Sequence, residues 1–413
     1  MSQKITAPRG TADVLPEQAA LRLRLEETAR ELLEAAGYGR GETPAFEATE
    51  LFARGVGEAT DIVQKEMYSF DDGGGRSLTL RPEGTAPICR AYVEHGMHKL
   101  AAPVKLYYIE SFFRAERPQA GRYREFWQVG AEALGSDDPA VAAELIVLLR
   151  QLLDSAGARD LQLRLSSLGT ASTRADYREQ LADYLRANTE RLSEAVRSRI
   201  ELNPLRAFDS DDPSTKAVMA GAPLLLDRLT PDDADHFAQV RSLLDIAGVS
   251  YEVDPTLVRG LDYYTRTVFE FNSDALGAQS GVGGGGRYDG LVELLGGPPT
   301  PGVGWAAGVE RILMAAGAAP EPLPGPDLYV AYDGARAEAF ETALEARKAG
   351  LRAELELAGR SLKGQLKHAE RLDARFVAIV EPAGARLRDR RGAGEVTLAR
   401  ERIVPEITQA LAR

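Results

Sequence analysis

The 413-residue sequence has one cysteine, Cys89, and four histidines. A single cysteine excludes an internal disulfide and a cysteine-based zinc site. His95-x-x-His98 could be a metal pair, but no other ligands cluster with it, so we expect no metal held by the protein. No apolar run is long enough to span a bilayer, and the polar segment Met1–Ala12 has the pattern of neither a signal peptide nor a transit helix. These absences favour a cytoplasmic protein.

The composition is acidic, with 62 acidic against 50 basic residues and a net charge of −12. This balance argues against nonspecific coating of a nucleic acid. The charge is uneven, however, because residues 326–413 carry 16 lysines and arginines against 14 acidic residues. We therefore expect any contact with a polyanion to involve this tail and selected patches of the acidic body.

The pattern of apolar residues predicts a large first domain over residues 1–320, a linker over 321–326 and a second domain over 327–413. Within the first domain, residues about 173–250 are helix-rich and contain few strand signals, which indicates an inserted helical subdomain or lid. In the last domain strands and helices alternate, which is typical of a small, mostly parallel α/β unit.

Two polar residues follow a predicted hairpin at Met67–Leu80. Glu83 and Thr85 stand where its second strand leads into a predicted helix, Ala86–His95. A carboxylate at this point could hold an ammonium group, or both side chains could simply cap the helix.

A strand at Val104–Phe113, a basic loop and a returning strand follow. Gln128, Gly130 and Glu132 share one face of the returning strand by the period of two, and polar residues there indicate the floor of a polar pocket. The loop contains four arginines, which could cradle a triphosphate or lie in solvent. They are Arg114, Arg117, Arg122 and Arg124.

Leu257–Phe271 runs from a charged turn into a predicted strand, Thr265–Phe271. Arg259 offers a fork of donors suited to a carboxylate or phosphate, but it could equally pair with Asp262 in a structural turn. Tyr263 and its neighbour Tyr264 each combine a ring that packs with a hydroxyl that donates.

Two glycine-containing stretches follow. Gly281–Leu291 could let backbone approach a ligand closely or form a flexible turn, and it matches no Walker or Rossmann pattern. Gly302–Met314 predicts a strand that passes into a helix, where Arg311 either points back over a ligand or is an exposed helix charge.

Taken in order, these stretches resemble the class II aminoacyl-tRNA synthetases, and within them the histidyl-tRNA synthetase family. Thr43-Pro44 and the following segment look like motif 1, Phe113-Arg-Ala-Glu-Arg-Pro-Gln to Glu132 like motif 2, and Gly304 to Arg311 like motif 3. Arg259-Gly-Leu-Asp-Tyr-Tyr264 looks like the signature particular to the histidine enzymes. The resemblance covers essentially the whole chain.

The resemblance implies an α+β fold: a six- or seven-stranded antiparallel sheet with flanking helices, a helical insertion, and a C-terminal α/β domain that binds the anticodon. It implies a homodimer, because motif 1 lies at the dimer interface in this class. The implied activity is ATP-dependent ligation of L-histidine to histidine tRNA through a histidyl-adenylate, with Mg²⁺ accompanying ATP.

The family also implies roles for residues at the ATP end of the site. Arg114 would bind the α-phosphate, Arg311 the γ-phosphate end, and Glu116 the adenine amino group. Arg259 would contact both the histidine carboxylate and the α-phosphate, which makes Arg259 and Arg114 the implied catalytic residues.

For the amino acid, the family implies that Glu83 and Thr85 hold the α-ammonium with Gln128 close by. Glu132 and Tyr264 would hydrogen-bond the imidazole. Two further tyrosines would complete the pocket: Tyr263 and Tyr288. In the tail, helix-face candidates for tRNA contacts are Arg360, Lys363, Lys367 and Arg371, which could equally form a solvated surface.

The sequence departs from the family at two places. Glu110-Ser111-Phe112 stands where Gly-Pro-Met is common before Phe-Arg, and Trp127 stands where His or Tyr often precedes the motif 2 glutamine. Both affect packing beside the pocket. An alternative is the non-catalytic, histidine-sensing regulatory subunit of ATP phosphoribosyltransferase, a relative that lacks the signature arginines and usually lacks the anticodon domain.

Overall fold

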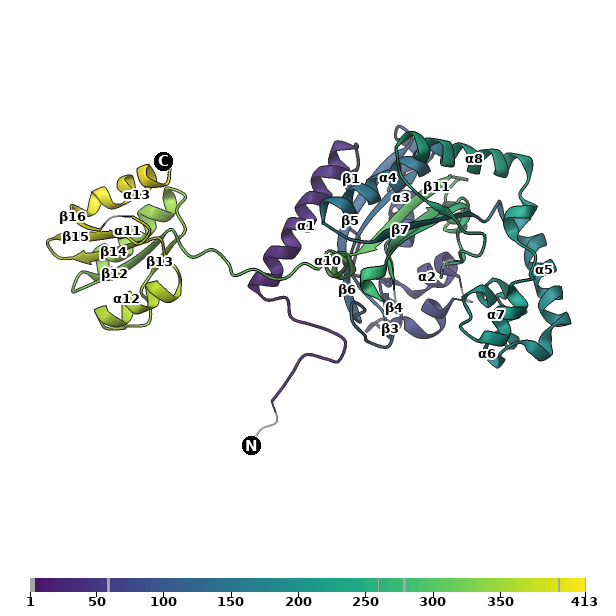
Figure 1. Cartoon of the computed structure of the whole chain (residues 1–413), viewed down its shortest axis with the longest axis horizontal. Coiled ribbons are helices and arrows are strands. Elements are labelled where there is room, and N and C mark those ends of the chain that lie inside the picture. Colours follow the sequence, from purple (N-terminus) through teal and green to yellow (C-terminus); the bar gives the residue numbers. More distant parts are fainter. Residues whose placement is uncertain (1–3, 58–59, 259, 278–279, 393, 413) are drawn as a thin grey trace. The chain divides into compact units, whose positions relative to one another are not determined.

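The computed structural model describes residues 4–57, 60–258, 260–277, 280–392 and 394–412 (Figure 1). Arg259, which the sequence suggests as catalytic, lies outside the described residues. The chain separates into two compact units, Met1–Pro320 and Glu321–Arg413. In the described parts of both units, no helix combines the length and apolar character needed to cross a bilayer.

Within the described residues, the centre of the first unit is an eight-stranded sheet in the order β1-β5-β6-β11-β10-β9-β7-β8. The inner strands pair antiparallel, and the two short outer strands, β1 and β8, pair parallel with their neighbours. The predicted antiparallel sheet is therefore confirmed, and parallel edge strands extend it. The strand bounds are β1 Gly39–Arg40, β5 Val104–Phe113, β6 Glu125–Leu134, β7 Leu161–Ser167, β8 Glu252–Val253, β9 Thr265–Ser273, β10 Gly281–Arg287 and β11 Gly302–Gly308.

The glycine-rich segment is a central strand of this sheet. β10 pairs with β9 on one side and with β11 on the other. The interpretation of this stretch as a flexible turn is therefore wrong. Glycine has low strand propensity and shows no alternation of side chains, so the period of two that reveals a strand is absent from this stretch of the sequence.

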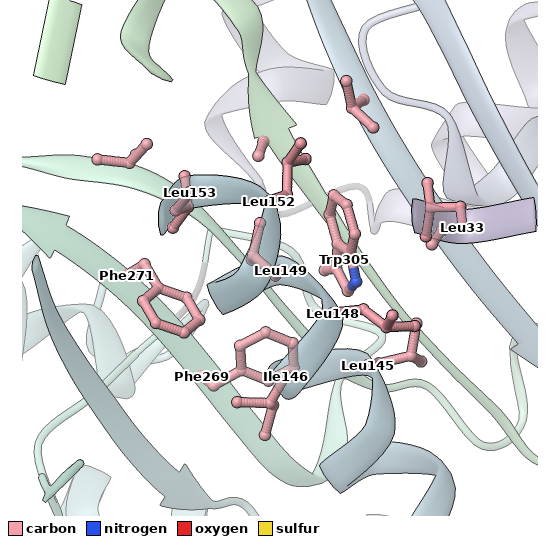
Figure 2. Packing of buried hydrophobic residues seen from close by; sticks show 14 of the residues in the cluster. Leu33, Leu145, Ile146, Leu148, Leu149, Leu152, Leu153, Phe269, Phe271 and Trp305 are labelled. Carbon is pink, nitrogen blue, oxygen red and sulfur yellow. The ribbon is translucent and has the colours of Figure 1, made fainter. Parts of the chain in front are cut away.

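Helices cover the sheet on the side that carries the largest apolar core. In α4 (Pro139–Ser155), Asp138 caps the start by accepting a hydrogen bond from Ala140 N at 2.8 Å, and Pro139 occupies the first turn. Figure 2 shows the leucines of α4 against Phe269 and Phe271 of β9 and Trp305 of β11. The other helices that contribute to this core are α1 (Pro16–Ala35), α8 (Pro231–Ile246) and α10 (Val309–Ala315).

A three-stranded sheet leads into the site. Its order is β2-β4-β3, and β3–β4 is the predicted hairpin. Asp72 holds the turn, because its Oδ1 accepts hydrogen bonds from Gly74 N at 2.8 Å and Arg76 N at 2.9 Å. The bounds are β2 Phe46–Ala48, α2 Thr49–Val56, β3 Tyr68–Asp71, β4 Ser77–Leu80 and α3 Thr85–Glu94.

The segment expected to be helix-rich is helical. Its last helix, α8, packs on the core of the large sheet, whereas the helices before α8 form a cluster of their own. Buried side chains such as Tyr177, Leu181 and Leu185 pack together there, and Leu257 and Tyr264 from outside the insert belong to the same cluster. The helices of this part are α5 Ala171–Ala187, α6 Glu194–Arg197 and α7 Pro213–Met219, followed by α8.

The second unit is an α/β fold around the sheet β13-β12-β14-β15-β16. The first three strands pair parallel, as the alternating pattern predicts, whereas β15 and β16 add an antiparallel extension that the sequence did not indicate. The bounds are β12 Leu328–Tyr332, α11 Arg336–Lys348, β13 Ala353–Leu355, α12 Leu362–Arg371, β14 Phe376–Glu381, β15 Gly384–Asp389, β16 Glu395–Leu398 and α13 Ile403–Leu411.

Candidate active site

A polar cavity of about 250 Å³ opens over the middle of the large sheet. It is bordered by the start of α3, the loop between β5 and β6, the segment before β9, and the start of α10. Arg122 of the basic loop lines it, together with eight other residues suggested by the sequence. They are Glu83, Thr85, Arg114, Glu116, Gln128, Tyr263, Tyr264 and Arg311.

Glu83 is held at the beginning of α3. Its Oε2 accepts a hydrogen bond from Thr85 N at 2.8 Å, and its Oε1 accepts one from Ala86 N at 2.9 Å. Burial raises the pKa of this carboxyl group, and the two backbone bonds act in the opposite direction. Glu83 therefore caps the helix and also lines the cavity, so a role as helix cap is compatible with a role in holding an ammonium group.

Glu132 is the centre of a buried hydrogen-bond network. Its side chain is fully buried, Thr85 donates to Oε1 at 2.7 Å, and Tyr288 donates to Oε2 at 2.6 Å. Burial raises the pKa of Glu132 to about 8. Glu132 and Tyr288 do not form the cavity surface themselves but lie directly behind it, since Thr85 is a lining residue.

Three tyrosines form one wall beside this network. The ring of Tyr263 meets Tyr264 edge-on at 4.7 Å between centroids and Tyr288 at 5.8 Å. The Tyr263 hydroxyl donates to Glu83 Oε2 at 3.4 Å, and burial raises the pKa of the hydroxyls of Tyr263 and Tyr288. The wall therefore presents protonated hydroxyl groups next to carboxyl groups.

Two glycines make this dense packing possible. A Cβ atom on Gly304 would lie 1.6 Å from Glu132 Oε2, and one on Gly130 would lie 2.1 Å from the ring of Tyr108. Tyr108 lies opposite Gly130 in the β5–β6 pair, lines the cavity, and places its hydroxyl 3.5 Å from Glu132 Oε1. Tyr108 is not among the residues suggested by the sequence, although a glycine inside a strand signals close approach of a neighbouring group.

The opposite end of the cavity is cationic. Arg114 Nε donates to Pro82 O at 2.9 Å, Arg311 Nε donates to Gly281 O, and Arg122 Nη1 pairs with Glu116 Oε2 at 3.2 Å. Burial, followed by the nearby Arg122 charge, lowers the pKa of Arg311. Of the four loop arginines named from the sequence, Arg114 and Arg122 line the cavity, whereas Arg117 and Arg124 do not.

The two ends meet at Gln128. Its Oε1 is buried and has no hydrogen-bond partner among the described residues, so it is an acceptor available to a ligand. The preceding residue, Trp127, is fixed by bonds from its backbone N to the Glu310 carboxylate at 3.1 and 3.2 Å. Arg22 of α1 stacks over the Trp127 ring at 3.2 Å. The departure at Trp127 is therefore accommodated outside the cavity.

The second departure is accommodated in a buried ion pair. Glu110 Oε1 lies 2.8 Å from Arg81 Nη1 and accepts a hydrogen bond from Thr43 N at 3.1 Å. Arg81 Nε also donates to Ser111 O at 2.8 Å. These bonds tie the segment around Thr43 to β5, so Glu110 supports the motif 1 region and does not enter the cavity.

The cavity lies on an antiparallel sheet, with carboxyl and hydroxyl groups at one end and arginines at the other. The β5–β6 loop borders it on one side, and the start of α10, which follows β11, borders it on another. This combination defines the class II aminoacyl-tRNA synthetase fold and its site. Comparison with known proteins narrows the class. A family model described as histidyl-tRNA synthetase matches residues 10–312.

Curated relatives agree with this match. The histidine–tRNA ligase of Desulforudis audaxviator is 49% identical, with 95% of this chain and 93% of that protein covered. That of Moorella thermoacetica is 47% identical, with 96% and 92% covered. The solved structure of apo S. aureus histidyl-tRNA synthetase is 33% identical, has a TM-score of 0.81 and covers 98% of this chain and 100% of its own. The chain belongs to the histidyl-tRNA synthetase family.

Proposed function

We propose that the protein activates L-histidine with ATP and transfers it to histidine tRNA through a histidyl-adenylate. The observation that carries this proposal is the two-ended cavity, with buried carboxyl and hydroxyl groups at one end and arginines at the other. A cavity of this kind suits an amino acid and a polyphosphate placed end to end. The names of the relatives support the same activity.

In the first step the histidine carboxylate attacks the α-phosphorus of ATP, and pyrophosphate leaves. Two anions approach each other, and negative charge grows in the transition state, so fixed cations beside the reacting atoms lower the barrier. We assign the α-phosphate to Arg114, the γ-phosphate end to Arg311 and the adenine amino group to Glu116. Arg259 keeps its proposed role between the carboxylate and the α-phosphate on the strength of the sequence alone.

At the amino-acid end, we assign the α-ammonium to Glu83, Thr85 and the open oxygen of Gln128. Imidazole carries one donor and one acceptor nitrogen when neutral. Tyr264 lines the cavity and would pair with one of these nitrogens. Glu132 lies directly behind the surface and would pair with the other after the side chains in front of it shift on binding, and Tyr263 and Tyr288 would close the pocket. A site that must satisfy such polar groups rejects analogues lacking them by on the order of 10⁴-fold.

Magnesium would enter with ATP. Mg²⁺ prefers phosphate oxygens, waters and one or two carboxylates over a cage of protein ligands. No group of three or more acidic, histidine or cysteine residues that could hold a metal occurs in the described residues, but one carboxylate not assigned to another role, that of Glu270, lines the cavity. This donor set fits a nucleotide-bound ion, which would offset phosphate charge during the attack.

The second unit would read the anticodon of the histidine tRNA. Three basic residues of α12 are exposed at a spacing of four, which places them on one face of the helix: Lys363, Lys367 and Arg371. Arg360, the fourth residue suggested from the sequence, pairs with buried Glu356 at 3.0 Å and so helps to hold the preceding loop. Because tRNA and ATP are the substrates, we expect the protein in the cytoplasm.

We also propose a homodimer. Phe46 and Phe70 are 51% and 45% exposed on the small sheet that follows Thr43, and their rings meet edge-on at 6.3 Å. An exposed aromatic pair next to the motif 1 segment is consistent with contact to a second copy. Light scattering of the protein should give twice the chain mass, and Phe46→Ser with Phe70→Ser should shift it toward the monomer. A wild-type monomer at micromolar concentration would contradict this assignment.

The activity is tested by exchange of labelled pyrophosphate into ATP with each amino acid in turn, followed by charging of purified tRNA. We expect exchange with histidine alone and charging of histidine tRNA. Histidine binding without any exchange would refute the catalytic proposal and indicate a regulatory subunit of ATP phosphoribosyltransferase. A solved structure from Bacillus halodurans whose name includes both functions shares only the fold with this chain, at 22% identity and a TM-score of 0.67.

A further inference from the structure

The helical insert contributes directly to the wall of the amino-acid end. Tyr264 lines the cavity, yet its buried ring belongs to the hydrophobic cluster formed by the insert helices. In the same cluster are Tyr177 and Leu181 of α5 and Leu257, which precedes the signature segment. One side of the proposed histidine pocket therefore rests on the core of the insert, whereas Glu83 and Thr85 come from the start of α3.

A hydrogen bond crosses the same boundary at Arg174. This residue lies in the first turn of α5, and its Nη1 donates to the backbone carbonyl of Tyr264. Burial lowers the pKa of Arg174, and the carboxylate of Asp262 acts in the opposite direction, so the guanidinium lies within the field of that carboxylate. A charged donor on a backbone carbonyl is among the stronger hydrogen bonds in proteins.

Further contacts hold the same short segment from both sides. Asn203 of the insert donates through Nδ2 to Asp262 Oδ1 at 3.2 Å. On the other side, Asp262 N donates to Val56 O at the end of α2 at 3.2 Å. Residues 261–264 are thus held between the insert and the body, and Arg174 of the insert donates to the backbone of Tyr264.

We infer that Arg174 is a positioning residue for the amino-acid site, acting through the Tyr264 backbone from the helical insert. This inference rests on the proposed function, because it takes the amino-acid end to bind histidine. Without the guanidinium, the carbonyl of Tyr264 loses its anchor, and the tyrosine wall loosens relative to Glu83 and Thr85. The cationic end of the cavity is built from other elements and keeps its geometry.

The test is pyrophosphate exchange with Arg174→Met, varying histidine and ATP separately. Loss of one charged hydrogen bond predicts a KM for histidine raised by about tenfold, with the KM for ATP changed by less than about twofold. Arg174→Lys retains a positive donor and should give an intermediate KM for histidine. Arg178→Met is the matched control, since Arg178 lies one turn further along α5 and its Nη2 donates to Leu202 O within the insert, at 2.7 Å.

The outcomes separate this inference from the proposed function. Absence of histidine-dependent exchange in the wild-type protein refutes the proposed function before any variant is compared. Wild-type exchange with an unchanged histidine KM in Arg174→Met overturns the inference alone, as does an equal rise in both KM values or the same rise in Arg178→Met. If Arg174→Met does not fold, Arg174→Lys decides: a histidine KM equal to wild type overturns the inference.

Discussion

The polar groups at the two ends of the cavity differ in their hydrogen-bond partners and in their exposure. At the amino-acid end the polar groups around Glu132 satisfy one another, and only Gln128 Oε1 among those named stays open: Glu132 is fully buried and accepts hydrogen bonds from both Thr85 and Tyr288. At the nucleotide end the arginines bond mainly to backbone carbonyls or to a partly exposed partner, and the Arg122 side chain is 40% exposed. A closed network can discriminate one small molecule, whereas half-exposed cations suit a large anion with many oxygens.

This comparison predicts that a single added methyl group is most damaging at the amino-acid end. In Gly304→Ala the new Cβ would lie 1.6 Å from Glu132 Oε2, so the strand or the carboxyl group must move. We expect histidine-dependent exchange to fall by on the order of 1,000-fold, with a lower melting temperature. Gly39→Ala in β1 of the same sheet is the control, because its nearest neighbour is 3.9 Å away. Equal activities of the two variants would refute the packing argument.

The next largest effect is expected at the nucleotide end. Arg311→Ala removes a half-buried cation from the cavity, and we predict that kcat/KM for ATP falls by about 100-fold while the KM for histidine changes by less than about threefold. Arg117→Ala serves as control, since Arg117 belongs to the same loop as Arg114 but does not line the cavity. If the histidine KM of Arg311→Ala rises by the same factor as kcat/KM for ATP falls, then the two ends of the cavity do not bind their ligands independently.

Glu83→Gln tests the amino-acid end without changing its size. In the wild type, backbone N–H groups of α3 donate to both Glu83 oxygens. The glutamine amide keeps one of these two acceptor oxygens but lacks the negative charge proposed to bind the α-ammonium. We expect the KM for histidine to rise by about 30-fold and the KM for ATP to stay within about twofold. An unchanged histidine KM would contradict a role for Glu83 in binding the α-ammonium and would indicate that it only caps the helix.

Glu132 predicts a pH dependence of stability. Its pKa is about 8 in the folded protein against an ordinary value of 4.5, so folding favours the protonated form. The stabilisation from this group is complete below about pH 4.5 and is lost as the pH rises through about 8. Glu132→Gln cannot titrate. Denaturant unfolding from about pH 5 to 9 should therefore show wild-type stability falling relative to Glu132→Gln by roughly 4 kcal/mol, and a constant difference would contradict the burial argument.

The smallest effect is expected for Arg122→Ala. Arg122 pairs with Glu116 across 3.2 Å in a partly exposed position, and such pairs contribute little. We predict less than a threefold change in kcat/KM for ATP, measured by exchange. A fall in kcat/KM for ATP as large as that of Arg311→Ala would show that Arg122 contacts the nucleotide directly.

Where side chains alternate, the fold could be predicted from the sequence. The hairpin before Glu83, the strand Val104–Phe113 and the strand predicted to begin at Thr265 all appear where the pattern indicates them. β10 could not be predicted, because a run of glycines has no periodicity and owes its strand conformation to pairing with β9 and β11. In β15 the buried face is only two residues, Ala385 and Leu387, alternating with arginines, and β16 is almost entirely exposed, so neither gives a clear strand signal in the sequence.

The candidate site likewise contains residues that could be predicted from the sequence and residues that could not. The polar lining residues named from the sequence were found because they stood where strands end, on one face of a strand, or in the family motifs. The network behind them was harder to see: Tyr108 looks like an ordinary strand aromatic until Gly130 is placed opposite it. The role of Arg174 could not be seen in the sequence, because its contact with Tyr264 joins positions 90 residues apart.

The central claim is that histidine and ATP occupy opposite ends of one cavity, and a crystal structure with histidine and a non-hydrolysable ATP analogue tests it most directly. The account predicts the α-ammonium at Glu83 and Thr85, the imidazole against Glu132 and Tyr264, and the phosphates beside the arginines. An imidazole among the arginines, or phosphates against Glu83, would contradict the account.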